Sequence, residues 1–206
     1  EGLYLKGIIR TDNPNYLFLD LDVRKAGDWN ITLSKGRKKH TFAYHIDNRR
    51  EGSAERESFS AKDVVYLIMP DRFANGDESN DSVAECAEGC NRSEPFGRHG
   101  GDIQGIIDHL DYLADLGVTA IWNTPPTLDN EGFASYHGYS TSDYYQIDPR
   151  FGSNELYKEF VAEAHKRGIK VIFDVVTNHC GTAHWWAGDF PSSDWVHNGD
   201  KPLITN

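Results

Sequence analysis

Residues 170–180 have the sequence KVIFDVVTNHC, in which an apolar run gives way to polar side chains. The run VIF has no alternation of polar and apolar residues, which is typical of a strand covered on both faces. Asp174 and His179 follow it, and α/β folds carry their chemistry at the carboxyl ends of parallel strands. The alternative is that Asp174 caps a turn and His179 is an ordinary surface histidine, because a single motif is often a coincidence.

Strands and helices alternate over the part of the chain that leads to this segment. The predicted elements are strands at residues 64–68, 118–122 and 170–176, and helices that begin at the N-caps Asp102 and Asn154 and end at Gly117 and Gly168. Strand, helix, strand, helix and strand, with short turns before the strands, predict a parallel sheet. The pattern leaves open whether that sheet is a closed barrel or an open one.

The connections that follow the first two predicted strands are long. They span residues 69–101 and 123–153, and loops of that length are uncommon without a function. Barrel enzymes build their sites from the loops at the carboxyl ends of their strands. We therefore expect a functional site in these two loops.

The first 50 residues have a different pattern, with short β-forming runs separated by turn residues. These runs lie at residues 16–23, 29–33 and 41–46. They predict a small antiparallel β-sandwich at residues 1–50, followed by a polar linker at residues 51–63 and the alternating region at residues 64–206. A carbohydrate-binding module, a dimerisation module and a plain scaffold would all fit the first region.

Composition and charge narrow the class of partner. Hydrophobic residues make up 38% of the 206 residues and charged residues 26%, as in ordinary soluble globular proteins. The net charge of −11 argues against a nucleic-acid partner, because it repels phosphates, and it is compatible with a neutral substrate. No apolar run approaches the ~18 residues that a membrane-spanning helix needs.

The three cysteines allow two interpretations of their redox state. Cys86 and Cys90 lie in the segment CAEGC, and Cys180 stands apart. A short-loop disulfide in an oxidising compartment and free thiols both fit this arrangement. A zinc site is less favoured, because the spacing is not CxxC.

The loop at residues 69–101 and its exit are rich in oxygen donors. The candidate cation ligands are Asn75, Asp77, Asn80, Asp81, Gly100 through its carbonyl, and Asp102. Calcium prefers about 6–8 oxygen ligands of this kind. A solvated acidic turn is the alternative, because Asn, Asp and Gly are also common turn formers.

The loop at residues 123–153 combines aromatic rings with carboxylates. The residues concerned are His137, Tyr139, Asp143, Tyr144, Tyr145 and Asp148. Sugars are bound by such mixtures, because flat rings cover their C–H faces and polar groups bind their hydroxyls. Packing in the core is the alternative for some of the tyrosines.

Four segments, in this order, resemble the α-amylase superfamily, glycoside hydrolase family 13. They read YLIMPDRFANGD, GGDIQGIIDHLDYLADLGVTAIWNTP, YHGYSTSDYYQIDPRFG and KVIFDVVTNHCG. The likeness is greatest to the neopullulanase and cyclomaltodextrinase branch and covers residues 64–206, and the preceding region resembles the sandwich of that branch. The resemblance implies an α/β fold, an incomplete (β/α)8 TIM barrel with its first three strands, preceded by part of a small β-sandwich domain. Because the sequence begins at Glu1 and stops in mid-pattern, we expect it to be an excerpt of a longer protein.

The resemblance also assigns roles to individual residues. It implies that Tyr139, His137, Asp174 and His179 bind the sugar at the cleavage subsite. It implies a structural calcium ion at the oxygen-rich residues named above. The catalytic carboxylates of the family lie on later strands, so we expect none in this chain and no activity from residues 1–206 alone.

The activity implied for the full-length protein is hydrolysis of α-1,4-glucosidic bonds in maltodextrins, cyclodextrins or pullulan, with retention of configuration. The partner would be an α-glucan oligosaccharide or a cyclodextrin. A transglycosylase, and a non-hydrolytic scaffold that binds a glycan or a protein, are the alternatives. We also expect that the full-length protein forms a homodimer. Its expected location is the periplasm, and the alternative is the cytoplasm.

Overall fold

The structure is a computed structural model that describes residues 2–196, and it divides into two compact units. One unit consists of residues 59–188, and the other joins residues 2–58 to residues 189–196. The two units are described separately below, and the larger one contains the candidate site. The predicted domain bounds at residues 50 and 63 stay a prediction.

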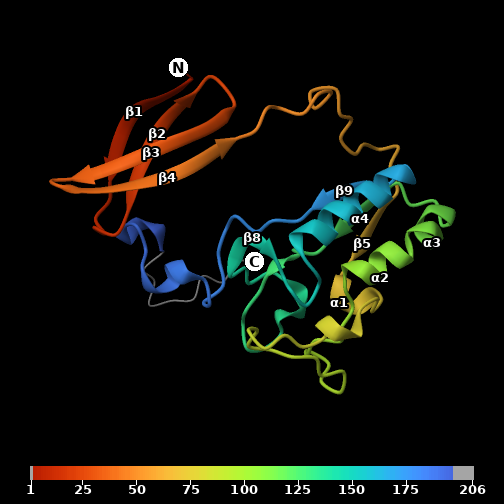
Figure 1. The fold of residues 1–206 in the computed structure, drawn as a ribbon. Helices are drawn as coiled ribbons and strands as arrows, with labels where there is room; N and C mark the ends of the chain where they lie inside the picture. The colour runs from red at the N-terminus through yellow and green to blue at the C-terminus, as the bar shows by residue number, and fades with distance from the viewer. Residues whose placement is uncertain (1, 197–206) are drawn as a thin grey trace. The chain divides into compact units, whose positions relative to one another are not determined.

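The larger unit contains a three-stranded parallel sheet, of which β5 and β9 are labelled in Figure 1. Its strands, in spatial order, are β5 (Val65–Ile68), β6 (Ala120–Asn123) and β9 (Lys170–Phe173). Leu67 pairs with Trp122, which pairs with Ile172. The prediction of a parallel sheet is therefore confirmed, and within the described residues this sheet does not close into a barrel.

The first predicted helix is present but broken in two. Its parts are α2 (Ile103–Asp108) and α3 (Leu110–Asp115). Asp102 caps α2 as predicted, since its Oδ1 accepts a hydrogen bond from the backbone N–H of Gly105 at 2.6 Å. The prediction of one continuous helix is wrong, because His109 leaves helical geometry and its Nδ1 donates to the Gly105 carbonyl at 2.7 Å.

The second predicted helix, α4 (Asn154–Lys166), has a different cap from the one expected. Ser153 is the N-cap, and its Oγ accepts from the backbone N–H of Leu156 at 3.0 Å. Asn154 instead accepts from the N–H of Ile147 at 2.8 Å and donates to the Tyr145 carbonyl at 3.0 Å. The capping prediction for Asn154 is wrong because its amide joins the helix to strand β8 (Asp143–Ile147).

The ends of α3 and α4 confirm the two predicted stop glycines. Gly117 has φ 88° and Gly168 has φ 73°, conformations that residues with a Cβ rarely adopt. Each glycine turns the chain directly into the strand that follows.

The short remaining elements of this unit are α1 (Pro70–Phe73), η1 (Glu78–Asn80), β7 (Thr127–Leu128), η2 (Ser135–His137) and η3 (Trp185–Gly188).

The apolar core lies between the sheet and the helices α2, α3 and α4. Its buried residues are Ile68, Ile103, Ile106, Leu110, Leu113, Val118, Ile121, Ile147, Phe151, Tyr157, Phe160, Ala164 and Ile169. The opposite face of the sheet is exposed at Val65, Leu67 and Trp122. The prediction that β9 is covered on both faces is wrong within the described residues, because no second layer packs on the face that Ile172 shares with Trp122 and Leu67.

The smaller unit contains two antiparallel hairpins (Figure 1). Its strands are β1 (Leu3–Arg10), which the sequence patterns missed, with β2 (Leu17–Val23), and β3 (Gly27–Lys35) with β4 (Lys38–Ile46). Apolar side chains such as Leu19 and Leu33 line a cleft of about 1090 Å³ between the hairpins. The predicted antiparallel strands are confirmed.

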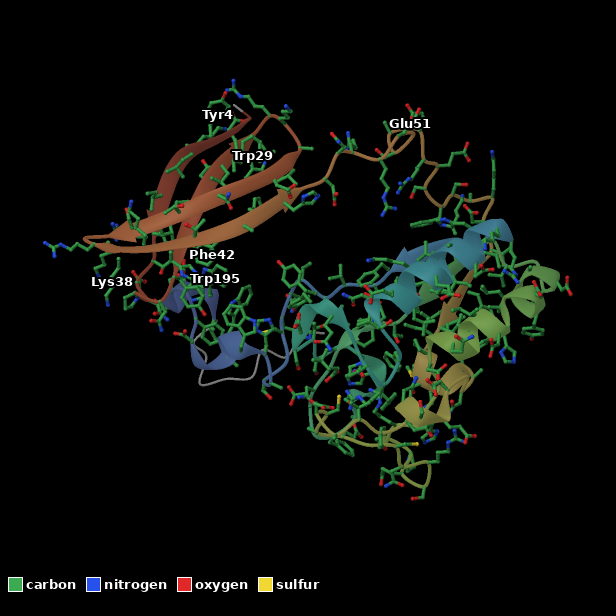
Figure 2. The ribbon with its side chains drawn as sticks, in the orientation of Figure 1. Tyr4, Trp29, Lys38, Phe42, Glu51 and Trp195 are labelled. Atoms are coloured by element: carbon green, nitrogen blue, oxygen red, sulfur yellow. The ribbon has the colours of Figure 1, made fainter. Side chains whose placement is uncertain are left out.

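Residues 189–196 lie against the turn between β1 and β2. The Asn13 amide donates to the Asp189 carboxylate at 2.5 Å. Trp195, which lies in η4 (Ser193–Trp195) and is labelled in Figure 2, stacks on Phe18 with ring centroids 5.9 Å apart. Among the described residues, no helix combines the length and the apolar character that crossing a bilayer requires.

Candidate functional site

Asp174 follows directly after β9 and joins two other elements at the carboxyl end of the sheet. Its Oδ2 accepts a hydrogen bond from Nε1 of Trp122, on β6, at 3.0 Å, and another from the Tyr139 hydroxyl at 3.2 Å. Among the described residues, Oδ1 of Asp174 has no hydrogen-bond partner. One oxygen of the carboxylate is thus fixed by the protein, and the other is open to a ligand.

The rings around Asp174 are partly exposed. Tyr139 is 37% exposed and Trp122 is 39% exposed, so an aromatic surface borders the carboxylate. Burial and the negative charge of Asp174 raise the pKa of Tyr139 above its usual value, so its hydroxyl keeps its proton and stays a donor. Trp122 was not predicted as a site residue. The sequence feature that could have identified it is an indole N–H donor near the end of a predicted strand, where polar groups converge.

His179 is bound by protein groups on both ring nitrogens. Its Nε2 donates to the Tyr139 carbonyl at 3.0 Å, and its Nδ1 accepts from the Asn178 amide at 3.2 Å. The Tyr144 hydroxyl donates to the His179 carbonyl at 2.8 Å. In this geometry His179 holds Tyr139, and a direct contact with a ligand would require it to exchange one of these bonds.

His137, which lies two residues before Tyr139 in the sequence, contacts the same tyrosine. Its Nδ1 accepts from the backbone N–H of Tyr139 at 2.9 Å, and the two ring centroids are 5.8 Å apart. Burial lowers the pKa of His137, so the neutral imidazole is favoured, with its proton on Nε2. The structure therefore brings together all four residues predicted to bind sugar. We call Asp174, Trp122, Tyr139, His137 and His179 the strand-end face.

The backbone beneath His137 is tightly confined. Gly138 has φ 78°, and a Cβ at this position would lie 2.0 Å from the Pro125 carbonyl oxygen. Ala134, just before η2, has φ 57° and is the one non-glycine residue with positive φ in the described part of the chain. This segment therefore has little freedom to shift unless its supporting contacts change.

A buried charge cluster, which the sequence patterns missed, supports the loop. Asp148 accepts from Nε of Arg150 at 2.9 Å and from its Nη2 at 2.7 Å, and Nη1 of Arg98 lies 3.5 Å from the same carboxylate. All three side chains are almost completely buried. Asp148, which the composition of the loop grouped with the sugar-binding residues, is therefore a structural partner of arginine. The sequence feature that could have predicted this ion pair is the close spacing of opposite charges in the segment DPR.

Asp129 supports the loop from within the same buried region. Its Oδ2 accepts from the backbone N–H of Ser140 at 3.0 Å, and its Oδ1 accepts from that of Glu131 at 3.2 Å. Burial is the main cause that raises the pKa of Asp129 to about 6, and the nearby charge of Asp148 acts in the same direction. Its protonation state therefore changes in mildly acidic solution.

The six residues predicted to bind calcium also gather in one place, which we call the oxygen cluster. They are Asn75, Asp77, Asn80, Asp81, Gly100 and Asp102. Asp102 holds the loop in place through three hydrogen bonds. Its carboxylate accepts from the backbone N–H groups of Gly76 at 3.1 Å and Asp77 at 2.8 Å, and from the side-chain amide of Asn80 at 3.3 Å. The Asn75 amide donates to Asp81 at 2.7 Å.

Two oxygens of this cluster lack a hydrogen-bond donor. The side-chain Oδ1 atoms of Asn75 and Asn80 are buried and have no partner. Buried polar atoms are nearly always paired, so these two oxygens fit a cation that is held by amide groups. Within residues 2–196, no group of three or more His, Cys, Asp or Glu side chains could hold a metal ion. A cation here would therefore depend on amide and backbone carbonyl oxygens.

The three cysteines, Cys86, Cys90 and Cys180, are free thiols in the structure. Burial raises the pKa of the Cys86 thiol, so this group stays protonated at neutral pH. Of the two arrangements that the sequence left open, the structure has the free thiols.

Comparison with known protein families identifies both units. The family model described as "Alpha amylase, catalytic domain" matches residues 67–201. The chain belongs to the alpha-amylase family. A second model, the amino-terminal domain of cyclomaltodextrinase, matches residues 1–50.

Individual relatives agree with this assignment. A cyclomaltodextrinase from Thermoanaerobacter pseudethanolicus is 47% identical over 140 residues, which are 67% of this chain and 22% of that protein. Neopullulanase 2 from Thermoactinomyces vulgaris is 43% identical over 147 residues, 70% of this chain and 24% of that protein. The α-amylase from Geobacillus thermoleovorans, solved in complex with acarbose, is 40% identical with a TM-score of 0.58, over 69% of this chain and 29% of that one. This alpha-amylase family chain thus spans a quarter or less of the curated relatives named here.

Proposed function

We propose that this chain is part of a retaining α-glucan hydrolase that cleaves α-1,4-glucosidic bonds in maltodextrins, cyclodextrins or pullulan. In this proposal Tyr139, His137, Asp174 and His179 bind the sugar next to the bond that is cleaved. The bond-breaking carboxylates lie on other parts of the full-length protein, so residues 1–206 alone have no activity. The sheet β5–β6–β9 then forms the first three strands of a (β/α)8 barrel.

The observation that carries the proposal is the shared carboxylate at the end of β9. Asp174 has one oxygen bonded to both Trp122 and Tyr139, and one oxygen open, between partly exposed rings. A sugar needs such an arrangement, because its hydroxyls bind a carboxylate while its C–H face packs on an aromatic ring. The names of the relatives support an α-glucan substrate, and one solved relative binds acarbose.

We also propose that the oxygen cluster binds a structural calcium ion. The side-chain oxygens of Asn75 and Asn80 and the Gly100 carbonyl would bind it directly, and the carboxylates of Asp77, Asp81 and Asp102 would supply negative charge around it. Its positive charge would supply the partner that the two buried amide oxygens lack. The ion would order the loop and take no part in bond cleavage.

The quaternary state and location are part of the same proposal. The full-length protein would form a homodimer through its amino-terminal domain and act in the periplasm, with the cytoplasm as the alternative. Sedimentation of the full-length protein and cell fractionation test these two points.

The decisive experiment follows the anomeric configuration of the first products by ¹H NMR. Purified full-length protein is incubated with maltoheptaose, β-cyclodextrin and pullulan in separate samples. We expect reducing ends that appear first as the α-anomer and then mutarotate, because two successive displacements retain configuration.

Other outcomes of this experiment separate the alternatives. Longer glucans formed at the expense of maltoheptaose, without net gain of reducing ends, would indicate a transglycosylase. Binding of β-cyclodextrin in calorimetry without any product would indicate a scaffold. First products with the β-configuration would contradict the retaining mechanism.

A further inference from the structure

The segment between Cys86 and Cys90 carries a carboxylate that the proposed function leaves without a role. Oε2 of Glu88 accepts two hydrogen bonds from Ser135, one from its backbone N–H at 2.7 Å and one from its hydroxyl at 2.6 Å. The two residues are 47 positions apart and belong to different long loops. Hydrogen bonds to an ionised acceptor are about twice as strong as neutral ones, so this contact ties the loops firmly together.

Ser135 occupies a critical position in the second loop. It is buried and begins η2, directly after Ala134 with its positive φ. An alanine in the left-handed region is unfavourable, so it persists only where surrounding contacts fix the backbone. Glu88 supplies the acceptor for both donors of Ser135, and Arg98 donates to the Ser135 carbonyl at 3.2 Å.

The consequence of moving Ser135 reaches the strand-end face within a few residues. His137 is the last residue of η2, and Tyr139 follows after Gly138, which packs so closely on Pro125 that there is no room for a side chain. His137 and Tyr139 are linked to each other by the hydrogen bond from the Tyr139 N–H to Nδ1. The placement of both rings therefore depends on where η2 begins.

Glu88 is itself held in place by the buried charge cluster. Nη1 of Arg150 donates to the Glu88 carbonyl at 2.7 Å, and Arg150 is fixed by two hydrogen bonds to Asp148. The carboxylate of Glu88 therefore extends from an anchored backbone.

We propose that Glu88 is a positioning residue for the strand-end face, acting through Ser135 on His137 and Tyr139. This inference rests on the proposed function, because it gives Glu88 a role in binding an α-glucan. In this proposal Glu88 itself does not contact the glucan. It fixes the residues that do.

The kinetic test compares variants of the full-length protein with β-cyclodextrin as substrate. Glu88→Ala should raise KM about tenfold and change kcat less than threefold, because a displaced loop weakens binding while leaving the bond-breaking groups in place. Glu88→Gln should stay within about twofold of wild type, since its amide oxygen can still accept both bonds from Ser135. Ser135→Ala, which removes one of the two bonds to Glu88 and the longer bond from Arg98 to the Ser135 hydroxyl, should raise KM about threefold.

The matched control is Glu85→Ala, which removes an exposed carboxylate from the same loop. It should leave KM and the melting temperature unchanged. If Glu88→Ala leaves KM unchanged, or if Glu85→Ala raises KM as much, the proposal is overturned. If Glu88→Ala does not fold, Ser135→Ala decides, and an unchanged KM in that variant overturns the proposal.

A second readout does not depend on activity. In ¹⁵N NMR of the wild-type protein, His137 should give the signals of a neutral ring protonated on Nε2, with Nδ1 as acceptor. Glu88→Ala should change these shifts toward a mixture of tautomers, and Glu88→Gln should not. Unchanged shifts in Glu88→Ala overturn the positioning role even if the enzyme is active. If the wild type acts on no glucan, the proposed function fails while this test still decides the role of Glu88.

Discussion

The oxygen cluster and the strand-end face are both polar, yet they satisfy their polar atoms in opposite ways. In the oxygen cluster, the amide oxygens of Asn75 and Asn80 are buried without a donor. In the strand-end face, Asp174, Tyr139 and His179 are hydrogen-bonded to neighbours and partly exposed. An unpaired buried oxygen costs about 1–3 kcal/mol, whereas an exposed group is satisfied by water.

This difference indicates which kind of ligand each region fits. A cluster with buried, unpaired oxygens gains stability when a cation binds, so its ligand should belong to the fold. A face whose groups are fixed by one another and open to water is prearranged for a ligand that comes and goes. The following four predictions test that contrast.

The largest effect is expected from Asp102→Ala in the oxygen cluster. Asp102 caps α2 and also accepts from the N–H groups of Gly76 and Asp77, so its removal leaves several donors unpaired. We expect a loss of about 3–4 kcal/mol in the free energy of unfolding, measured by urea denaturation with a chelator in all samples. Asp115→Ala, an exposed aspartate on α3, is the control, and an equal loss there would refute the role of Asp102.

The second effect concerns the support of the strand-end face by Asp129. Its pKa of about 6 in the folded protein lies above the unfolded value of 3.8, so the folded state holds this proton more tightly. The resulting stabilisation is fully present below about pH 4 and is lost as the pH rises through 6, by at most about 3 kcal/mol.

Asp129→Asn isolates this contribution, because the titration of all other groups cancels in the difference from wild type. The free energy of unfolding of the wild type relative to Asp129→Asn should fall between pH 4 and pH 7. A difference that is flat across this window would contradict the buried, protonatable state of Asp129.

The third effect is expected from His179→Ala in the strand-end face. The variant loses the hydrogen bond to the Tyr139 carbonyl and any bond that the imidazole forms with a sugar hydroxyl as the transition state develops. We expect kcat/KM on maltoheptaose to fall about tenfold, or ~1.4 kcal/mol, in the full-length protein. Asn178→Ala, which removes only the donor to Nδ1, should have a much smaller effect. Unchanged kinetics in His179→Ala would rule out its role.

The smallest effect is expected from removal of the proposed calcium ion. A cation that satisfies Asn75 and Asn80 should add about 1 kcal/mol or more to stability, so chelation should lower the melting temperature by roughly 2–4 °C. Differential scanning calorimetry with a chelator, followed by addition of calcium, measures the change, and elemental analysis measures bound metal. Identical melting curves together with no metal in the purified protein would exclude the calcium site.

Local sequence signals predicted much of the fold. The apolar run of β9, the cap at Asp102 and the stop glycines Gly117 and Gly168 act within a few residues, and the structure confirms each of them. The break at His109 was not predictable in the same way, because it depends on a ring nitrogen that bonds the preceding turn. The exchange of caps at Ser153 depends on a partner strand that the patterns did not show.

In the candidate site, too, local features were predictable and contacts between distant residues were not. The residue types of Tyr139, His137, Asp174 and His179 could be identified from their loops, and the structure places them together. The contacts of Trp122 with Asp174 and of Glu88 with Ser135 join residues about 50 positions apart. Such pairs have no local signature in a single sequence, so only the folded chain identifies them.

The uncovered face of the sheet has a practical consequence for handling the protein. Val65 and Leu67 on the edge strand β5 and Trp122 on the central strand β6 form an exposed apolar surface. Surfaces of this kind promote aggregation, because both the apolar side chains and the unpaired strand edges attract other chains. Residues 1–206 expressed alone are therefore expected to aggregate.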